Sequence, residues 1–277
     1  MVGYVSKVDT VKDWLDLVES HTPAAHAAGW DNVGLQVGDP GWLVERVLVS
    51  LDVTSEVIAE AAEVPGTLVL AHHPLLFRPL ARLTPDTATG KIALAAAVSR
   101  VAVAAAHTNL DVADDGTGTS QPTATVLGLT NVRSLTAEGD DPRRGFGILG
   151  TLPAPTTLAD LAARLMAGLP APDLRFAGDP DRLATTVAIV GGAGDTHVGD
   201  AIDAGADVYV TGDLRHHVTL DALEMGLAVI DAGHHGTENP AMEPWRVKLG
   251  QLASAVGLRA PLVASAVPTS PWVRTGA

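Results

Sequence analysis

The order of predicted elements constrains the fold of this chain more than any other feature of its sequence. A buried strand, a helix, a strand followed by adjacent histidines, a helix and a strand followed by a further histidine occur in residues 46–107 and again in residues 186–235. Regular alternation of strands and helices predicts an α/β fold with mostly parallel sheets. Because the order is repeated, we expect two similar α/β lobes, residues 1–125 and residues 126–277.

Apolar periodicity and turn-forming residues place the individual elements. Residues 111–145, rich in Gly, Thr, Asp and Pro, are predicted to be a loop-rich connector with one short helix, at the start of the second lobe. The predicted strands are residues 46–52, 67–70, 101–105, 146–152, 186–190, 207–210 and 227–230, and the predicted helices are residues 10–19, 55–63, 92–99, 158–169, 198–204 and 220–225.

Histidines gather directly after the predicted buried strands. Seven of the ten histidines lie in four such segments: His72 and His73, His107, His216 and His217, and His234 and His235. The carboxyl ends of parallel strands meet at one edge of a sheet, where ligands bind. A single histidine after a strand is usually a cap or a hydrogen-bonded loop residue, but that explanation does not account for the clustering. The pattern favours a metal site.

Carboxylates accompany the histidines at the same strand ends. Asp111 follows His107 by four residues, and Glu238 follows His234 by four. One helical turn would bring His234 and Glu238 onto one face. The chain has no cysteine, so any metal is held by nitrogen and oxygen, a set that suits Zn, Mn, Fe, Co or Ni. This many ligands exceeds one mononuclear catalytic site, which favours two divalent metal ions per chain and hydrolytic chemistry.

Two glycine-containing segments have weaker signals. Residues 191–196 (GGAGDT) resemble a phosphate-binding turn but lack its full pattern, and the alternative is a tight strand-to-helix turn. Residues 30–38 (WDNVGLQVG) combine a Trp with Asp and Asn in a loop, and functional and structural interpretations of this segment both stay open.

Charge and hydropathy exclude several classes of protein. The formal net charge is −14, no Lys/Arg cluster occurs and aromatic residues make up 4% of the chain, so we expect no nucleic-acid binding. Arg100 and His107 interrupt the Ala/Val-rich stretch after Ile92, so no apolar run is long enough to span a membrane. The N-terminal residues lack the features of a signal peptide, and we expect a cytoplasmic protein.

Seven motifs together resemble one known family. WDNVGLQVG, LDVT, AHHPLLF, HTNLD, GILGTLP, TGDLRHH and DAGHHGTE stand between Val8 and Pro240 in the order typical of the Nif-three-like dinuclear-metal hexameric proteins, often labelled GTP cyclohydrolase 1 type 2 homologues. The resemblance implies two α/β lobes that enclose a dinuclear metal centre. Some members of the family carry a large inserted domain between the lobes, but the connector here is too short for it. The family resemblance also implies a toroidal homohexamer.

The resemblance also implies roles for particular residues. The implied metal ligands are His72, His73, Asp111, His234 and Glu238, with Glu238 as the bridging ligand. His107 and His217 match positions near the site where proton transfer or orientation of a ligand is plausible. His216 and His235 stand where the family often has Tyr, and as imidazoles they could alter metal preference or add a cation site.

Two functions follow as hypotheses. The first is a metal-dependent hydrolase that acts on a small-molecule substrate, with His107 or His217 transferring the proton. The family label suggests GTP, although nothing in the residues specifies guanine. The alternative is a metal-handling or regulatory binding protein without turnover.

Overall fold

The computed structural model describes residues 8–138, 141–171 and 174–272, and these divide into two compact units. Unit 1 comprises residues 8–110 and 242–269, and unit 2 comprises the described residues of 111–241 together with 270–272. The predicted lobe boundary at residues 125 and 126 therefore falls inside unit 2, and the C-terminal helix belongs to unit 1.

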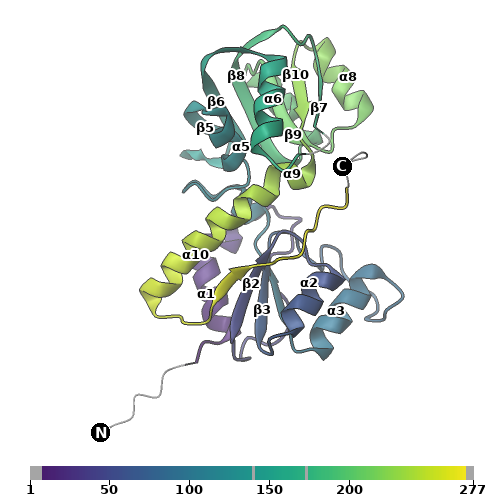
Figure 1. Ribbon diagram of the computed structural model, residues 1–277, viewed down its shortest axis with the longest axis vertical. Helices are drawn as coiled ribbons and strands as arrows, with labels where there is room; N and C mark the ends of the chain where they lie inside the picture. Colours follow the sequence, from purple (N-terminus) through teal and green to yellow (C-terminus); the bar gives the residue numbers. More distant parts are fainter. Residues whose placement is uncertain (1–7, 139–140, 172–173, 273–277) are drawn as a thin grey trace. The chain divides into compact units, whose positions relative to one another are not determined.

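Unit 1 is an α/β unit with helices on both faces of its sheet (Figure 1). Its elements are α1 (Val11–His21), η1 (Ala24–His26), β1 (Gly34–Val37), β2 (Arg46–Ser50), α2 (Ser55–Ala62), β3 (Thr67–Ala71), α3 (Ala88–Val98), β4 (Ala102–Ala105), α4 (Thr108–Asp111, whose last residue is assigned to unit 2), α10 (Met242–Val256) and β11 (Leu262–Ala264).

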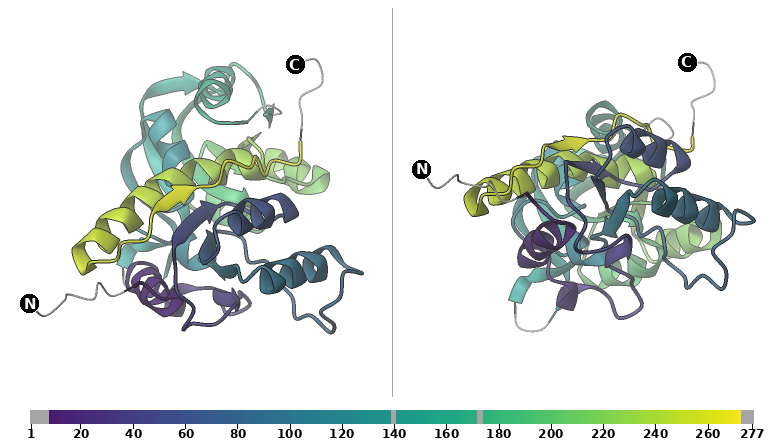
Figure 2. Two further views of the ribbon diagram at one scale, coloured as in Figure 1. Left: turned by 60° about the horizontal axis from the view of Figure 1, so that its bottom comes forward. Right: turned by 90° about the horizontal axis from the view of Figure 1, so that it is seen from below.

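The sheet of unit 1 has the strand order β1-β4-β3-β2-β11. Strands β11, β2, β3 and β4 run parallel, and β1 pairs antiparallel with β4. Alternate residues of the strands point to opposite faces, so Leu48, Val69 and Val103 share a core with α2 and α3. Helix α10 contacts α1 and β2, and β11 returns along α10 to reach the edge of the sheet (Figure 2).

Threonine caps define where several helices begin. The side chains of Thr10, Thr54 and Thr87 each accept a hydrogen bond from the backbone N–H three residues later, at the starts of α1, α2 and α3. Thr157 does the same at the start of α6 (Leu158–Gly168) in unit 2. At α1, Asp13 completes a capping box because its carboxylate accepts the backbone N–H of Thr10 at 2.9 Å. Such caps satisfy N–H groups that have no partner within the helix.

Unit 2 has a sheet of its own, again with helices on both faces (Figure 1). Its elements are α5 (Gln121–Leu127), β5 (Thr130–Glu138), β6 (Asp141–Thr157), α6 (Leu158–Gly168), β7 (Arg175–Ala177), β8 (Leu183–Ala193), η2 (Asp195–His197), α7 (Val198–Asp203), β9 (Val208–Gly212), α8 (His216–Glu224), β10 (Ala228–Asp231), α9 (His234–Glu238) and η3 (Asn239–Ala241).

The strand order of this sheet is β5-β6-β8-β9-β10-β7. Strands β8, β9 and β10 are parallel, whereas β5, β6 and β7 join by antiparallel pairing. Ile189, Val210 and Ile230 pack with α5 and α6 on one face. Their neighbours Ala188, Tyr209 and Val229 pack with α7 and α8 on the other.

The predicted two-sheet α/β fold is confirmed, and the predicted repeat is found as β2-α2-β3-α3-β4 in unit 1 and β8-α7-β9-α8-β10 in unit 2. The sheet of unit 2 is mixed rather than mostly parallel, because antiparallel strands extend the repeat on both sides. The prediction of a loop-rich connector was wrong for much of residues 111–145, which contain α5, β5 and the start of β6.

Among the described residues, no helix combines the length and the apolar character needed to cross a membrane.

Candidate metal centre

The carboxyl ends of the adjacent strands β3 and β4 bring three histidines together in unit 1. His72 and His73 follow β3, and His107 follows β4. Backbone hydrogen bonds continue past the ends of the strands, from His72 to Ser50 at 3.1 Å and from Ala106 to Ala71 at 3.0 Å. This continued pairing fixes the backbone from which the imidazoles project.

The three imidazole rings lie close enough to share a cation. Ring centroids are 5.0 Å apart for His72 and His73, 5.1 Å for His72 and His107, and 5.6 Å for His73 and His107. One ring nitrogen from each residue lies within 4.8 Å of those of the other two. His72 is fully buried, and the other two are partly exposed.

Each of these rings has a defined partner at Nδ1. The His72 Nδ1 lies 3.0 Å from the carbonyl oxygen of Ala106, the His73 Nδ1 2.8 Å from Asp52 Oδ1, and the His107 Nδ1 2.9 Å from Asp31 Oδ1. An acceptor at Nδ1 places the proton there, which leaves Nε2 as the nitrogen with a lone pair. Metal-binding histidines in proteins are typically oriented in this way.

Asp31 is a carboxylate held in its ionised form. Burial raises the pKa of the Asp31 carboxyl, but the hydrogen bonds that His107 and Thr108 donate outweigh burial and hold the pKa well below its usual range. Thr108 donates both its backbone N–H, at 3.0 Å, and its hydroxyl, at 2.5 Å, to Asp31 Oδ2. Asp31 is thus a fixed anion that orients the His107 ring.

In unit 2, His234 and Glu238 lie on one turn of α9. The His234 Nε2 is 3.0 Å from Glu238 Oε2, as the four-residue spacing predicts. The Nδ1 of His234 lies 2.8 Å from Asp213 Oδ2, which repeats the histidine–carboxylate pairing of unit 1. Glu238 is buried, and a buried carboxylate is favourable only beside a cation or hydrogen-bond donors.

Gly191 and Gly192, near the end of β8, leave space for the Glu238 side chain. Gly192 has a φ of +70°, and a Cβ at this position would lie 2.0 Å from Glu238 Oε1. The Gly192 N–H donates to Thr237 Oγ1 at 2.9 Å, which ties this segment to α9. The GGAGDT segment could be a phosphate-binding turn or a tight turn from its sequence. In the structure, its second glycine is required because any larger residue would clash with Glu238.

Asp111 adjoins the same glycine segment within unit 2. The Thr119 hydroxyl donates to Asp111 Oδ1 at 2.5 Å. A Cβ at Gly191 would lie 3.0 Å from Thr119 Oγ1 and 3.4 Å from Glu238 Cγ, so Thr119 and Glu238 flank this glycine. Unit 2 therefore gathers Asp111, His234 and Glu238 around Gly191 and Gly192.

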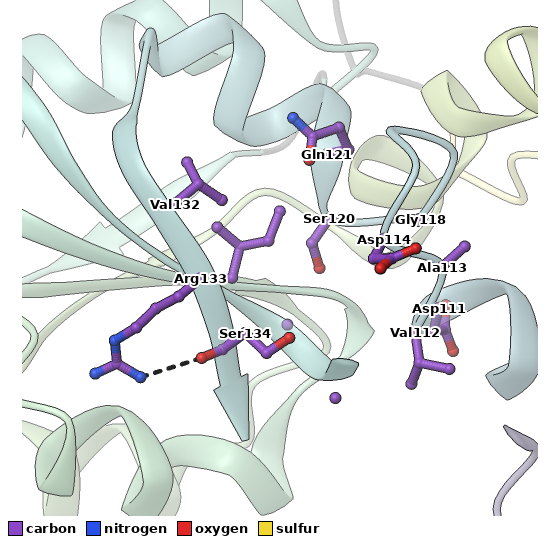
Figure 3. A pocket seen from close by; sticks show the side chains of 13 residues that line it. Asp111, Val112, Ala113, Asp114, Gly118, Ser120, Gln121, Val132, Arg133 and Ser134 are labelled. Carbon is purple, nitrogen blue, oxygen red and sulfur yellow. Dashed lines mark hydrogen bonds between the residues drawn. The ribbon is translucent and has the colours of Figure 1, made fainter. Parts of the chain in front are cut away.

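A small cavity of about 160 Å³, lined by both polar and apolar residues, lies beside Asp111 (Figure 3). Its polar lining includes Ser120, Arg133 and Ser134, and the Arg133 guanidinium donates to the Ser134 carbonyl oxygen at 3.2 Å. The sequence does not indicate these residues, because β5 (TNVRSLTAE) has neither a continuous apolar run nor a strict alternation of apolar and polar residues, which is why residues 111–145 resemble a connector.

The remaining candidate histidines lie elsewhere in unit 2. His216 and His217 are exposed on the first turn of α8, with ring centroids 5.2 Å apart, and His235 is half-buried in α9. The metal-binding groups found among the described residues include none of these three. Proton transfer by His217 and an additional cation site at His216 or His235 stay predictions.

These features define the class of protein: an α/β protein with two sheets and candidate metal ligands of imidazole and carboxylate. The sequence matches the profile of the Duf34/NIF3 (NGG1p interacting factor 3) family over residues 9–271, and the chain belongs to this family.

Relatives and solved structures agree with this assignment. The chain is 37% identical over 255 residues to a GTP cyclohydrolase 1 type 2 homolog of Streptomyces coelicolor, covering 90% of this chain and 89% of the relative. It is 33% identical over 263 residues to the protein of the same name in Clostridium acetobutylicum, with 95% and 97% covered. A Bacillus cereus protein related to NIF3 has a similar structure, with a TM-score of 0.89, 26% identity, and coverage of 97% of this chain and 100% of that chain.

Proposed function

We propose that this chain binds two divalent metal ions through His72, His73, Asp111, His234 and Glu238, and that it is a metal-dependent hydrolase. The observation that carries the proposal is the set of partners at Nδ1, which turns each histidine into an oriented Nε2 ligand. Oriented imidazoles together with a buried carboxylate are the arrangement expected of a metal centre.

The number and type of ligands favour two ions. A catalytic metal usually takes three protein ligands, so a set of five ligands exceeds what one ion would need and favours a pair. When bound, two such cations would activate water and polarise the electrophilic centre of a substrate. The chain's own contribution is to hold the ligands fixed and to transfer a proton.

His107 is the residue proposed for proton transfer. Its Nδ1 is engaged by Asp31, which fixes the ring beside His72 and His73 and directs Nε2 away from that hydrogen bond. His217 is the second candidate, and the matched variants His217→Ala and His216→Ala would separate its role from that of its exposed neighbour.

The name shared by the Streptomyces and Clostridium relatives supplies the first substrate class to test. We propose a purine nucleotide, hydrolysed at an electrophilic carbon or phosphorus. The cavity beside Asp111 has room for a polar substituent of the substrate, because Ser120, Ser134 and Arg133 supply hydrogen-bonding groups there.

The metal site is tested by elemental analysis of purified protein and of His73→Ala. The wild type should contain about two metal ions per chain, a number expected of a dinuclear site, and His73→Ala should contain fewer. His197→Ala is the matched control, because His197 also has a carboxylate partner, Asp200 Oδ2 at 2.8 Å, but is not a proposed ligand. Equal metal contents in the wild type and in His73→Ala would contradict the assignment.

Turnover is tested separately with Glu238→Gln, which removes the charge and keeps the size of the side chain. The metal-loaded wild type should hydrolyse a member of a nucleotide and phosphoester panel, and Glu238→Gln should not. Absence of turnover by the metal-loaded wild type across nucleotide, phosphoester and amide panels would instead favour metal handling without catalysis.

We also propose that the chain assembles as a homohexamer, as expected from the family resemblance. Sedimentation equilibrium of the purified protein tests this proposal, and a monomeric mass would contradict it.

A further inference from the structure

Trp30 and Phe77 form an aromatic corner with His107 in unit 1. The centroid of the Trp30 ring lies 5.9 Å from that of Phe77 and 6.2 Å from that of His107, and Phe77 lies 6.1 Å from His107. The three interplanar angles are 73°, 72° and 86°, so no two of these rings stack face to face. The WDNVGLQVG and AHHPLLF segments thus place two aromatic rings beside a candidate catalytic histidine.

Hydrogen bonds of polar side chains connect the two segments that carry these rings. The Asn32 side-chain amide donates to the Leu76 carbonyl oxygen at 2.6 Å, and the Leu76 N–H donates to Gln36 Oε1 at 2.8 Å. Gln36 Nε2 donates in turn to the Asn32 carbonyl oxygen at 2.7 Å. The segment that follows Trp30 is therefore held against the residue before Phe77, and the position of the rings is determined by more than their mutual contact.

The rings are nevertheless exposed to solvent. Trp30 is 63% exposed and Phe77 is 44% exposed, although aromatic residues make up only 4% of the chain. Edge-to-face contacts of this kind contribute modestly to stability, and burying these large rings would contribute more. Two fixed, exposed rings beside a histidine cluster are suited to binding a flat group.

We propose that Trp30 and Phe77 bind a planar aromatic ring of the ligand whose reacting group lies at the histidine cluster. The inference rests on the proposed function, since it places the substrate at those histidines, and it makes Trp30 a residue that determines specificity. Stacking of a planar ring on an exposed indole is independent of any one pattern of ring substituents, so the corner selects for an aromatic ring as a class.

The test compares two probes that differ only in the ring. Guanosine 5′-monophosphate and ribose 5-phosphate share a sugar and a phosphate, and calorimetric titration of each into metal-loaded protein isolates the contribution of the base. The wild type should bind the nucleotide about five- to 150-fold more tightly than the sugar phosphate, the range typical of one stacked base.

Variants of Trp30 test whether the aromatic corner causes this difference in affinity between the two probes. Trp30→Leu should lose most of the preference for the nucleotide, and Trp30→Phe should keep part of it. Trp272→Leu is the matched control, because Trp272 is 73% exposed and lies in the part of the chain assigned to unit 2. Metal content measured on each variant shows whether the cluster is intact.

Two results would overturn the inference: equal affinity of the wild type for the two probes, or an unchanged nucleotide preference in Trp30→Leu. If the second result came with a change in sedimentation of Trp30→Leu, the corner would be assigned to contact with a second copy of the chain. A wild type that holds no metal, yet still prefers the nucleotide, would count against the proposed metal centre and leave the aromatic corner supported.

Discussion

Replacing Gly192 with alanine should have two effects: strain in the backbone at this position, and a clash of the new Cβ with Glu238. Gly192 has a φ of +70°, a conformation that residues other than glycine rarely adopt. A Cβ here would lie 2.0 Å from Glu238 Oε1 and 3.3 Å from His234 Nε2. Since ordinary contacts with a Cβ begin at about 3.4 Å, the Glu238 carboxylate must move by more than about 1 Å.

The two effects have different magnitudes. The left-handed backbone costs alanine about 1–2 kcal/mol, and the smaller entropy of the unfolded chain offsets about 0.4–1 kcal/mol of this. We therefore expect Gly192→Ala to reduce the free energy of unfolding by roughly 1 kcal/mol. Metal ligands tolerate displacements of only about 0.2 Å, so the affinity for metal should fall by at least about tenfold.

Gly205→Ala is the matched control, because Gly205 has a φ of +73° and open space around its Cβ position. Urea denaturation should show similar losses of stability in the two variants. Competition with a chelator of known affinity should show weaker metal binding in Gly192→Ala alone. Equal metal affinity in Gly192→Ala, Gly205→Ala and the wild type would refute the argument that Glu238 is a ligand held against this glycine.

Three further predictions concern the supporting carboxylates and the metal. Asp52→Asn should weaken metal binding about 10- to 100-fold in chelator competition, because the His73 Nδ1 loses its ionised partner. Burial raises the pKa of Asp207, but hydrogen bonds from Thr185 and Thr186 lower it further than burial raises it. The stability that Asp207 provides is thus present above a pH of about 4 and lost below it; urea midpoints of Asp207→Asn and the wild type should differ at neutral pH and converge in acid. Dialysis against EDTA should remove the metal without loss of helical circular dichroism, since the cores of both units consist of apolar residues.

Local patterns in the sequence were sufficient to predict the central repeat and the placement of histidines directly after its strands. Each half of the repeat is a set of apolar strands and amphipathic helices whose periodicities differ, and His72, His73 and His107 stand directly after such strands. The spacing of His234 and Glu238 also predicted their contact, because one helical turn determines it.

Partners that are distant in sequence were not predictable from local patterns. Asp31 lies 76 residues from His107, and Asp52 lies 21 residues from His73, so neither pairing leaves a signal in the spacing. The edge strand β5 was missed because its exposed residues lack a continuous apolar run. The assignment of α10 to unit 1 depends on the burial of Trp245 and Leu249, and helical periodicity does not indicate which sheet a helix covers.

Anomalous diffraction from crystals grown with Mn²⁺ or Zn²⁺ would locate the bound metal ions and their ligands. We expect two peaks about 3.5–4 Å apart, the separation typical of two-metal sites, with the Nε2 atoms of His72, His73 and His234 and the carboxylates of Asp111 and Glu238 around them. A single peak, or two peaks at separate places with Glu238 bound to neither, would contradict the proposed dinuclear centre.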